Sequence, residues 1–205
     1  LYDADKISDF RELVNRYSTL YADQVAFEYK KTPDASEHIK IKYSEFVEDI
    51  KALGTALINL GLSKKRIAII SPNRYEWCAS YLAITTSDMV VVPLDRALPD
   101  NEIEDLIVRS KAEAVIFDKK YEEIFRKIAN NKNTSLNHFI SMDDLDGFTS
   151  YSSLIRKGHS LLVNGDNKYD NVKIDNNEMS IMLFTSGTTS ISKAVALSQA
   201  NICED

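Results

Sequence analysis

The beginning of the chain alternates between helix-like and strand-like spacing of apolar side chains. At residues 7–20 the apolar positions recur every three or four residues, which predicts an amphipathic helix. Two short runs, 25–29 and 39–43, flank a polar turn and predict a β-hairpin. A second helix is expected over 44–60, because Gly61 follows this periodic stretch and glycine is the usual residue just beyond a helix.

From residue 66 onward, short and uniformly apolar runs alternate with helical patterns. Parallel strands that are buried on both faces produce such runs, and the helices between them form right-handed crossovers. The sequence therefore predicts an α/β fold with a mostly parallel, doubly wound sheet and flanking helices. The apolar runs lie at 67–70, 89–92, 114–117, 138–141 and 179–184, and the helical patterns at 74–85, 100–110, 121–129 and 152–162.

A polar stretch that is poor in core residues lies near the end of the chain. Residues 164–171 contain asparagine, aspartate and glycine, a composition that is typical of surface loops. We therefore assign residues 1–162 to an α/β lobe and 163–177 to a polar linker. Residues 178–205 are expected to form a strand, a loop and a second strand that begin a further subdomain.

Composition and charge narrow the classes of protein that these elements can form. The 205 residues are 44% hydrophobic, which is enough for a sizeable core, and 25 basic against 31 acidic side chains give a net charge of −6. This balance argues against a nucleic-acid partner, since binding to phosphodiester backbones needs a basic surface. No apolar run approaches the length of about 20 residues that spans a bilayer. Peripheral contact with a membrane stays an open alternative. Two distant cysteines and three scattered histidines argue against a disulfide scaffold and a zinc site, and favour a cytoplasmic location.

The most informative segment follows the apolar run at 179–184. Residues 185–193 read Thr-Ser-Gly-Thr-Thr-Ser-Ile-Ser-Lys and combine hydroxyl groups with one glycine and one lysine. Such a loop can direct backbone amides and hydroxyls at one point, with Gly187 allowing close approach and Lys193 adding a positive charge. These groups suit a polyphosphate. The alternative is a polar turn whose hydroxyls cap the ends of two strands.

Gly187 and Lys193 have the spacing of the P-loop pattern GxxxxGK[ST], but two positions fail. Ser192 replaces the second glycine, and Ala194 replaces the hydroxyl residue that binds magnesium. Residues 194–197 also have the pattern of a strand, where a P-loop requires a helix. We therefore expect a different phosphate loop, set between two strands.

The order of residues in this segment resembles the signature of the adenylate-forming (AMP-binding) enzyme superfamily. Residues 182–189 read Met-Leu-Phe-Thr-Ser-Gly-Thr-Thr, and a lysine and a Ser-x-x-Asn motif follow. The usual form is Tyr-Thr-Ser-Gly-Thr-Thr-Gly-x-Pro-Lys-Gly, followed by Ser-His-x-Asn. The hydroxyl and lysine positions are kept, whereas the lost glycines and proline mainly shape the turn. The departures are Phe184, Ser190, Ser192, Ala194 and Gln199.

Earlier blocks resemble the long-chain fatty-acid branch of this superfamily. Residues 22–27 and 43–46 look like the opening of fatty-acyl-CoA ligases. The stretch 66–77, Arg-Ile-Ala-Ile-Ile-Ser-x-Asn-Arg-x-Glu-Trp, is similar to their next block, and Val-Val-Pro-Leu at 91–94 to the one after. The resemblance thus covers most of the chain and implies the N-terminal part of the large domain of such an enzyme.

The resemblance implies a two-step reaction that uses ATP, Mg²⁺ and coenzyme A. A carboxylic acid, here a long-chain fatty acid, forms acyl-AMP with release of pyrophosphate, and coenzyme A then displaces AMP to give acyl-CoA. Thr185 is also the candidate magnesium ligand, and no catalytic residue of the family is assigned to this chain. The residues that the resemblance places against the ATP phosphates are Thr185, Ser186, Gly187, Thr188, Thr189 and Lys193.

The resemblance also implies that the chain is the N-terminal piece of a larger ligase. The family's Tyr-Gly-x-Thr-Glu motif does not occur here, and the sequence ends where a helix capped by Ser198 is expected to begin. We expect this piece alone to make no acyl-CoA, because it lacks the C-terminal part of the same enzyme. Two alternatives remain: a non-catalytic nucleotide-binding or assembly module, and an acyl-AMP ligase that loads a carrier protein. The sequence indicates neither the acyl chain length nor the oligomeric state.

Other residues that could belong to a site receive structural interpretations. Trp77 and Tyr81 are expected to pack in the core of a crossover helix rather than line an acyl tunnel. The carboxylates at 100–105 are expected to offset a helix dipole rather than bind a metal. His138 is interpreted as a surface or hydrogen-bonded histidine, because no nucleophile accompanies it.

Overall fold

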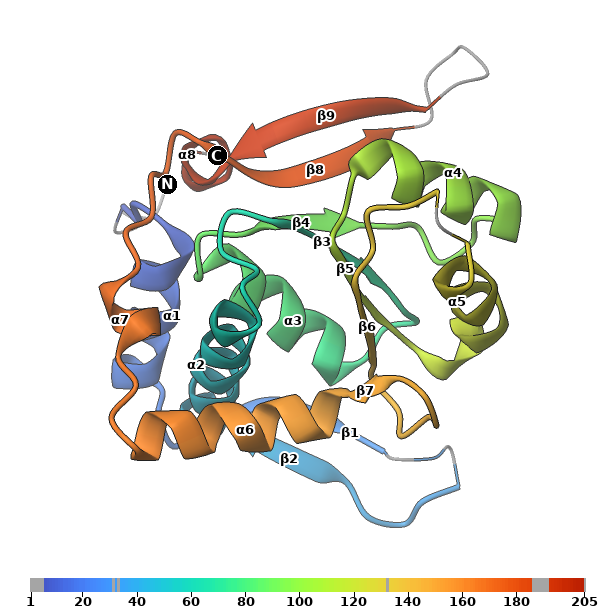
Figure 1. The fold of residues 1–205 in the computed structure, drawn as a ribbon. Coiled ribbons are helices and arrows are strands. Elements are labelled where there is room, and N and C mark those ends of the chain that lie inside the picture. The colour runs from blue at the N-terminus through green and yellow to red at the C-terminus, as the bar shows by residue number, and fades with distance from the viewer. Residues whose placement is uncertain (1–5, 31, 33, 132, 186–191, 205) are drawn as a thin grey trace.

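A computed structural model describes residues 6–30, 32, 34–131, 133–185 and 192–204. These residues form a two-stranded hairpin and a seven-stranded sheet with helices on both of its faces (Figure 1). The antiparallel hairpin and the two helices beside it agree with the spacing of the apolar residues. These N-terminal elements are α1 (Phe10–Leu20), β1 (Val25–Tyr29), β2 (Ile39–Lys42) and α2 (Tyr43–Asn59).

Local sequence features explain where α1 begins and where α2 ends. α1 starts three residues later than its apolar pattern, because Asp9 is its N-cap and accepts a hydrogen bond from the backbone N–H of Glu12 at 2.8 Å. α2 ends as predicted before Gly61, whose φ of +80° lies in the left-handed region that favours glycine.

The seven-stranded sheet has the strand order β7-β6-β5-β3-β4-β8-β9. Neighbouring strands are parallel, except that β8 and β9 are antiparallel. The predicted α/β fold with a mostly parallel, doubly wound sheet is therefore confirmed. The strands are β3 (Arg66–Ile70), β4 (Val90–Pro93), β5 (Ala114–Phe117), β6 (His138–Ser141), β7 (Thr149–Ser150), β8 (Met179–Thr185) and β9 (Lys193–Ser198).

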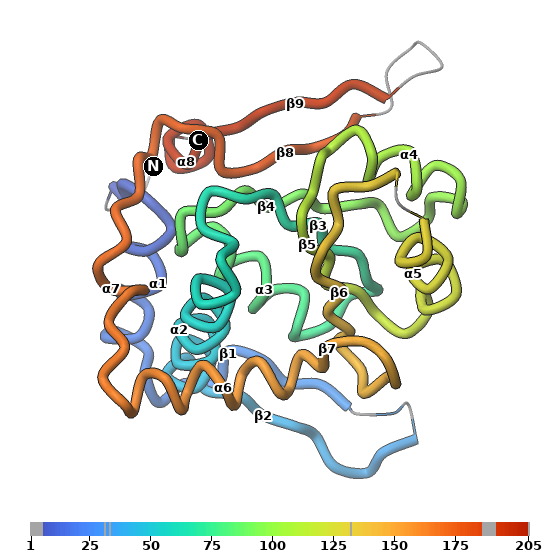
Figure 2. Tube along the Cα trace, in the orientation of Figure 1, coloured from blue at the N-terminus to red at the C-terminus, as the bar shows by residue number. Residues whose placement is uncertain are grey.

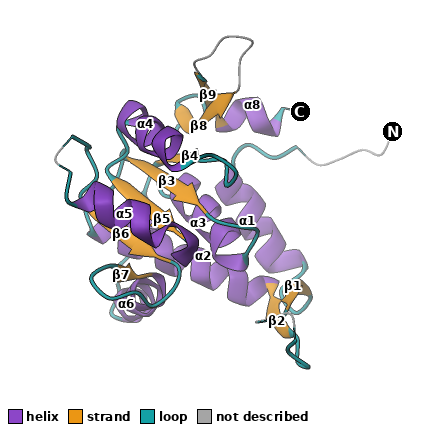
Figure 3. Cartoon of the chain, turned by 90° about the vertical axis from the view of Figure 1, so that its right-hand side faces the viewer, coloured by secondary structure: helices purple, strands orange, loops and turns teal. Residues whose placement is uncertain are grey.

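Helices cover the two faces of the sheet and create two cores (Figure 3). Alternate residues of β3 belong to different cores. Ile67 and Ile69 pack with α2, α3 (Tyr75–Thr85) and α6 (Tyr151–Val163), whereas Ala68 and Ile70 pack with α4 (Asp100–Ser110) and α5 (Glu122–Ala129). None of the described helices combines the length and the apolar composition that crossing a membrane requires. The remaining helices are α3 (Tyr75–Thr85), α4 (Asp100–Ser110), a short 3₁₀ turn (Lys119–Tyr121), α5 (Glu122–Ala129), α6 (Tyr151–Val163), α7 (Lys168–Asn171) and α8 (Gln199–Cys203).

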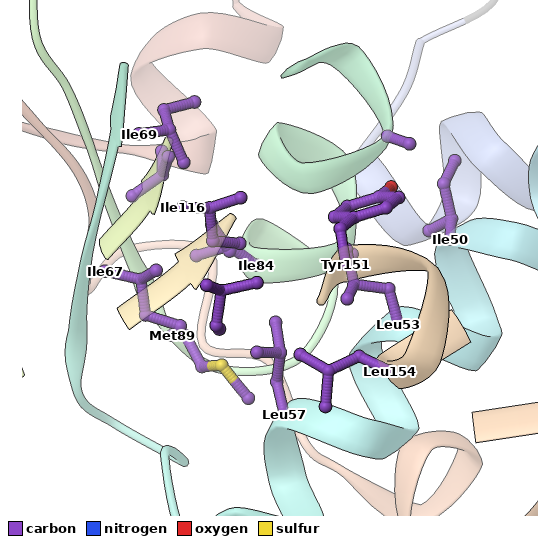
Figure 4. Packing of buried hydrophobic residues seen from close by; sticks show 14 of the residues in the cluster. Ile50, Leu53, Leu57, Ile67, Ile69, Ile84, Met89, Ile116, Tyr151 and Leu154 are labelled. Carbon is purple, nitrogen blue, oxygen red and sulfur yellow. The ribbon is translucent and has the colours of Figure 1, made fainter. Parts of the chain in front are cut away.

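The first core holds α2 and α6 against the sheet (Figure 4). Leu57 of α2 and Leu154 of α6 are 0% and 4% exposed and lie beside each other. Gly158 lets the two helices approach, because a Cβ atom at this position would lie 1.9 Å from the carbonyl oxygen of Ala52. The crossing of α2 and α6 therefore depends on a residue without a side chain.

The stretch 163–177, predicted to be a polar linker, contains the short helix α7. α7 lies beside α1 although the two helices are far apart in the sequence (Figure 2). Tyr169 is 5% exposed, its hydroxyl donates to Thr86 Oγ1 at 2.9 Å, and the guanidinium of Arg11 lies 4.8 Å from its ring centroid. One aromatic side chain thus anchors a largely polar segment. The division of the chain into subdomains at this segment stays a prediction.

Candidate functional site

Thr185 and Lys193, the two described ends of the predicted phosphate segment, lie at the outer end of an antiparallel ribbon formed by β8 and β9 (Figure 1). The last described pair of this ribbon joins Thr185 to Lys193, and the pair before it joins Phe184 to Ala194. Residues 186–191 between the two strands lie outside the described residues, whereas Lys193–Ser198 form the second strand of the expected strand–loop–strand arrangement. A P-loop would have placed a helix there, so the P-loop alternative is excluded.

Thr185 and Lys193 lie directly opposite each other where the ribbon opens. Paired residues of antiparallel strands project their side chains from the same face, with Cβ atoms about 5 Å apart. Both residues are exposed. A hydroxyl and an ammonium group therefore share one accessible face at the end of the ribbon. The other predicted phosphate contacts, Ser186, Gly187, Thr188 and Thr189, lie outside the described residues.

Arg109 of α4 reaches the same end of the ribbon, and the sequence did not predict this. Its Nη2 donates to the carbonyl oxygen of Ser192, next to Lys193, and its guanidinium carbon lies 5.4 Å from the ring centroid of Phe184. Its Nη1 donates to Asp105 Oδ2 at 3.1 Å. Two cationic residues thus belong to this end of the ribbon. Because 83 positions separate Arg109 from Ser192, no local pattern indicates their contact.

The inner end of the ribbon continues into α8, which Ser198 caps as predicted. The Ser198 Oγ accepts the N–H of Asn201 at 3.2 Å. Gln199, which stands where the resemblance has histidine, is 1% exposed. Its amide accepts the backbone N–H of Phe10 and donates to the carbonyl oxygen of Thr85, both at 2.8 Å. This buried amide connects the base of the ribbon to α1 and α3.

A charged cluster lies at the carboxyl ends of the central parallel strands. Arg74, the N-cap residue of α3, pairs with Glu76 at 2.7 Å, Asp118 at 2.6 Å and Asp143 at 3.0 Å. Burial alone would lower the pKa of Arg74, but the hydrogen bond and charge of Glu76, followed by the two aspartates, raise it overall. β3 and β5 are neighbours whose following helices lie on opposite faces, which is the kind of edge where α/β proteins commonly bind ligands. Here, the protein's own charges occupy this edge.

A second polar group links three helices beside this cluster. The hydroxyl of Tyr75 donates to Asp49 Oδ2 at 2.8 Å, and His159 Nε2 lies 3.2 Å from the other carboxylate oxygen of Asp49. Burial, with the charge of Asp49 next in importance, raises the pKa of Tyr75. The phenol therefore stays protonated and keeps α2 and α3 joined.

The remaining residues that the sequence singled out have structural surroundings. Trp77 and Tyr81 stack with ring centroids 5.4 Å apart and pack against the first core, as expected. Asp100 and Glu102 lie in the first turn of α4, where carboxylates offset the helix dipole. His138 is half-buried at the start of β6. Within the described part of the chain, no three histidine, cysteine or acidic side chains are grouped to hold a metal ion.

Comparison with known proteins agrees with the fold and the ribbon. A likeness to the crystal structure of a long-chain-fatty-acid-CoA ligase from Archaeoglobus fulgidus has a TM-score of 0.81 at 18% sequence identity, and covers 100% of this chain and 39% of that one. This likeness supports the fold alone.

Two curated proteins give sequence matches over most of the chain. It is 28% identical over 173 residues to fatty acyl-CoA synthetase A of Dictyostelium discoideum, which covers 80% of this chain and 26% of that protein. It is 28% identical over 178 residues to long-chain-fatty-acid–CoA ligase 5 of Mus musculus, which covers 79% of this chain and 25% of that protein. The chain therefore spans about a quarter of the length of these relatives. The family model described as AMP-binding enzyme matches residues 15–205, and the chain belongs to this family.

Proposed function

We propose that the complete natural protein is an AMP-forming acid–thiol ligase that activates a fatty carboxylic acid with ATP and passes the acyl group to coenzyme A. The observation that carries the proposal is the pairing of Thr185 with Lys193 at the open end of the β8–β9 ribbon. Membership of the AMP-binding family supports the adenylate-forming reaction. The names of the two curated relatives support a fatty acid as the substrate class.

The ribbon's proposed role is to hold the phosphates of ATP. Lys193 supplies a positive charge and Thr185 a hydroxyl, and both are exposed to an incoming ligand. The segment 186–189 is proposed to add further hydroxyl and backbone contacts, as the resemblance implies. Donors that are fixed before the reaction stabilise the negative charge that develops on a leaving group, and this effect is commonly a large part of catalysis.

The proposed chemistry has two displacements. In the first, a carboxylate oxygen of the acid bonds to the α-phosphorus of ATP while the bond from this phosphorus to the pyrophosphate oxygen breaks. Lys193 attracts the charge that the pyrophosphate acquires. In the second, the sulfur of coenzyme A bonds to the acyl carbon, AMP leaves, and the thiol proton is released to solvent or a base.

The described residues fit a magnesium ion that is bound chiefly by the nucleotide. Mg²⁺ takes oxygen ligands, commonly keeps several waters and is bound by one or two carboxylates beside substrate phosphates, so one protein hydroxyl would supply one ligand among several. The exposed hydroxyl of Thr185 is the proposed ligand. When bound, the ion neutralises charge on the phosphate oxygens.

The test measures the reaction of the complete natural protein with ATP, coenzyme A and fatty acids of several lengths. We expect exchange of pyrophosphate into ATP that depends on the fatty acid, followed by formation of acyl-CoA. Lys193→Ala is expected to raise KM for ATP by about tenfold or more, because a charge-assisted contact to phosphate is lost. Lys157→Ala removes an exposed lysine from α6 and serves as the control.

Each other outcome has a defined meaning. An undiminished ATP affinity and rate in Lys193→Ala would overturn the assigned role of this residue. ATP binding without acyl-AMP formation would favour a non-catalytic nucleotide-binding module. Transfer of the acyl group to a carrier protein instead of coenzyme A would favour an acyl-AMP ligase.

Two further properties belong to this proposal. We place the enzyme in the cytoplasm, a choice that the free thiols of Cys78 and Cys203 support. Cell fractionation checks this. We also expect residues 1–205 alone to make no acyl-CoA, since they span about a quarter of the two relatives. ATP-dependent thioester formation by this chain would contradict that expectation.

A further inference from the structure

Arg109 contacts both strands of the β8–β9 ribbon at its open end. On the β9 side its Nη2 donates to the carbonyl oxygen of Ser192, and on the β8 side its guanidinium carbon lies 5.4 Å from the ring centroid of Phe184. Ser192 immediately precedes Lys193, and Phe184 immediately precedes Thr185. The side chain of Arg109 therefore contacts the backbone next to Lys193 and the aromatic ring of the residue next to Thr185, and these two residues are the proposed ATP contacts.

α4 gives this contact a fixed base. Ile103, Leu106 and Ile107 are at most 4% exposed and hold the helix against the sheet in the second core. Asp105, one turn before Arg109, accepts a hydrogen bond from Nη1 at 3.1 Å and so orients the guanidinium. These two side chains are 59% and 31% exposed, and such a pair contributes little to stability. The contacts of Arg109 with the ribbon therefore indicate its role better than its contribution to the stability of the fold.

We propose that Arg109 is a positioning residue for ATP: it holds the open end of the β8–β9 ribbon and thereby sets where Lys193 meets the phosphates. This inference rests on the proposed function. The hydrogen bond to Ser192 fixes the backbone that carries Lys193. The cation–π contact with Phe184 fixes the strand that carries Thr185.

A second arginine makes the same three kinds of contact elsewhere in the molecule. Arg126 of α5 donates to the backbone carbonyl oxygen of Asp146 at 2.8 Å, lies 4.8 Å from the ring centroid of Phe148, and pairs with Glu122 one turn earlier at 2.7 Å. These partners belong to the connection between β6 and β7 and to α5, not to the ribbon. Arg126→Ala therefore removes matched contacts without changing the surroundings of Lys193.

The test compares steady-state kinetics of the complete natural protein and its Arg109→Ala, Arg109→Lys and Arg126→Ala variants, with ATP and fatty acid varied separately. Arg109→Ala is expected to raise KM for ATP by about three- to tenfold, because Arg109 acts on ATP only through the ribbon and only part of the lost interaction affects the phosphate contact. KM for the fatty acid is expected to stay unchanged. Arg109→Lys should recover part of the loss, because an ammonium group can still donate to the Ser192 carbonyl. Arg126→Ala should keep the wild-type KM for ATP.

The outcomes separate this inference from the proposed function. A wild-type protein that forms no acyl-AMP would overturn the proposed function. A wild-type protein that forms acyl-AMP, together with an unchanged KM for ATP in Arg109→Ala, would overturn the positioning role alone. An equal rise in Arg126→Ala would also overturn it, because the effect would then be a general one. If Arg109→Ala does not fold, Phe184→Leu removes the cation–π contact and keeps an apolar side chain against the second core. An unchanged KM for ATP in that variant counts against the role.

Discussion

Arg74 Nη1 lies 2.6 Å from Asp118 Oδ2 and joins the chain segments that follow β3 and β5. The same nitrogen lies 3.0 Å from Asp143 Oδ2, after β6. The arginine and the two aspartates are only 23%, 12% and 24% exposed. One guanidinium therefore pairs with two mostly buried carboxylates at the carboxyl edge of the sheet.

Replacing Arg74 with methionine is expected to lower the free energy of unfolding by about 2–3 kcal/mol, because Asp118 and Asp143 would keep mostly buried charges without their partner. Urea unfolding measures the loss. Lys127→Ala breaks an exposed pair with Glu104 and should change stability by less than about 0.5 kcal/mol. Equal effects in the two variants would show that the cluster is no more important than a surface pair.

Gly158→Ala is expected to destabilise the protein by about 2–4 kcal/mol, because the new Cβ atom would overlap the carbonyl oxygen of Ala52 and force α2 and α6 apart. At an exposed helical position the same change stabilises a protein by about 1 kcal/mol. The sign of the change in the free energy of unfolding therefore shows whether Gly158 lies at a close contact between the helices. Thermal unfolding provides the measurement, with Lys157→Ala at the preceding, exposed position as the control. A stabilised Gly158→Ala variant would mean that the two helices separate without cost.

Gln199→Leu is expected to cost about 2–4 kcal/mol, because the N–H of Phe10 and the carbonyl oxygen of Thr85 lose their buried partner. Gln24→Leu makes the same chemical change at an exposed position and should be nearly neutral. Chemical unfolding of both variants measures the two changes in the free energy of unfolding. A neutral Gln199→Leu would indicate that α1 and α3 do not depend on this amide.

Asp166 gives the protein an acid-sensitive contact at the start of α7. The backbone N–H of Lys168 and, next in importance, the side-chain amide of Asn59 donate to its carboxylate at 2.9 and 3.0 Å and lower the pKa of Asp166. A carboxyl group whose pKa is lowered in the folded state stabilises the protein above its unfolded pKa of about 3.9 and loses this effect as the pH falls further.

We therefore expect the urea concentration at the unfolding midpoint to decrease as the pH is lowered from about 5 to about 3. This decrease should be smaller in Asp166→Asn. Urea unfolding at a series of pH values measures the two slopes. Asp34→Asn, at an exposed position between β1 and β2, should keep the wild-type slope. Identical slopes in the wild type and Asp166→Asn would contradict the assignment.

The apolar pattern predicts most of the fold because burial on one or both faces leaves a period that can be read locally. The all-apolar run of β3 and the glycine stop after α2 are examples. β7 is only two residues long and carries no period, and Tyr169 is the one buried residue of α7. Neither could be predicted from periodicity.

The candidate site divides in a similar way. The order of hydroxyls and lysine predicts the ribbon and the places of Thr185 and Lys193. The reach of Arg109 to Ser192 and of Arg74 to Asp143 depends on how helices and strands pack across 83 and 69 positions. The distant partners of long, flexible side chains cannot be inferred from a local sequence pattern. Only the structure therefore shows these contacts.

The hydrogen bond between Phe10 and Gln199 also has a consequence for how the chain is made. It joins residues that are 189 positions apart. During synthesis α1 leaves the ribosome well before its partner on α8, which emerges only after nearly all of the sheet has been translated. Contacts of such high sequence separation form late and slow folding. The backbone N–H of Phe10 therefore lacks its partner on α8 until almost the last of these residues has been synthesised.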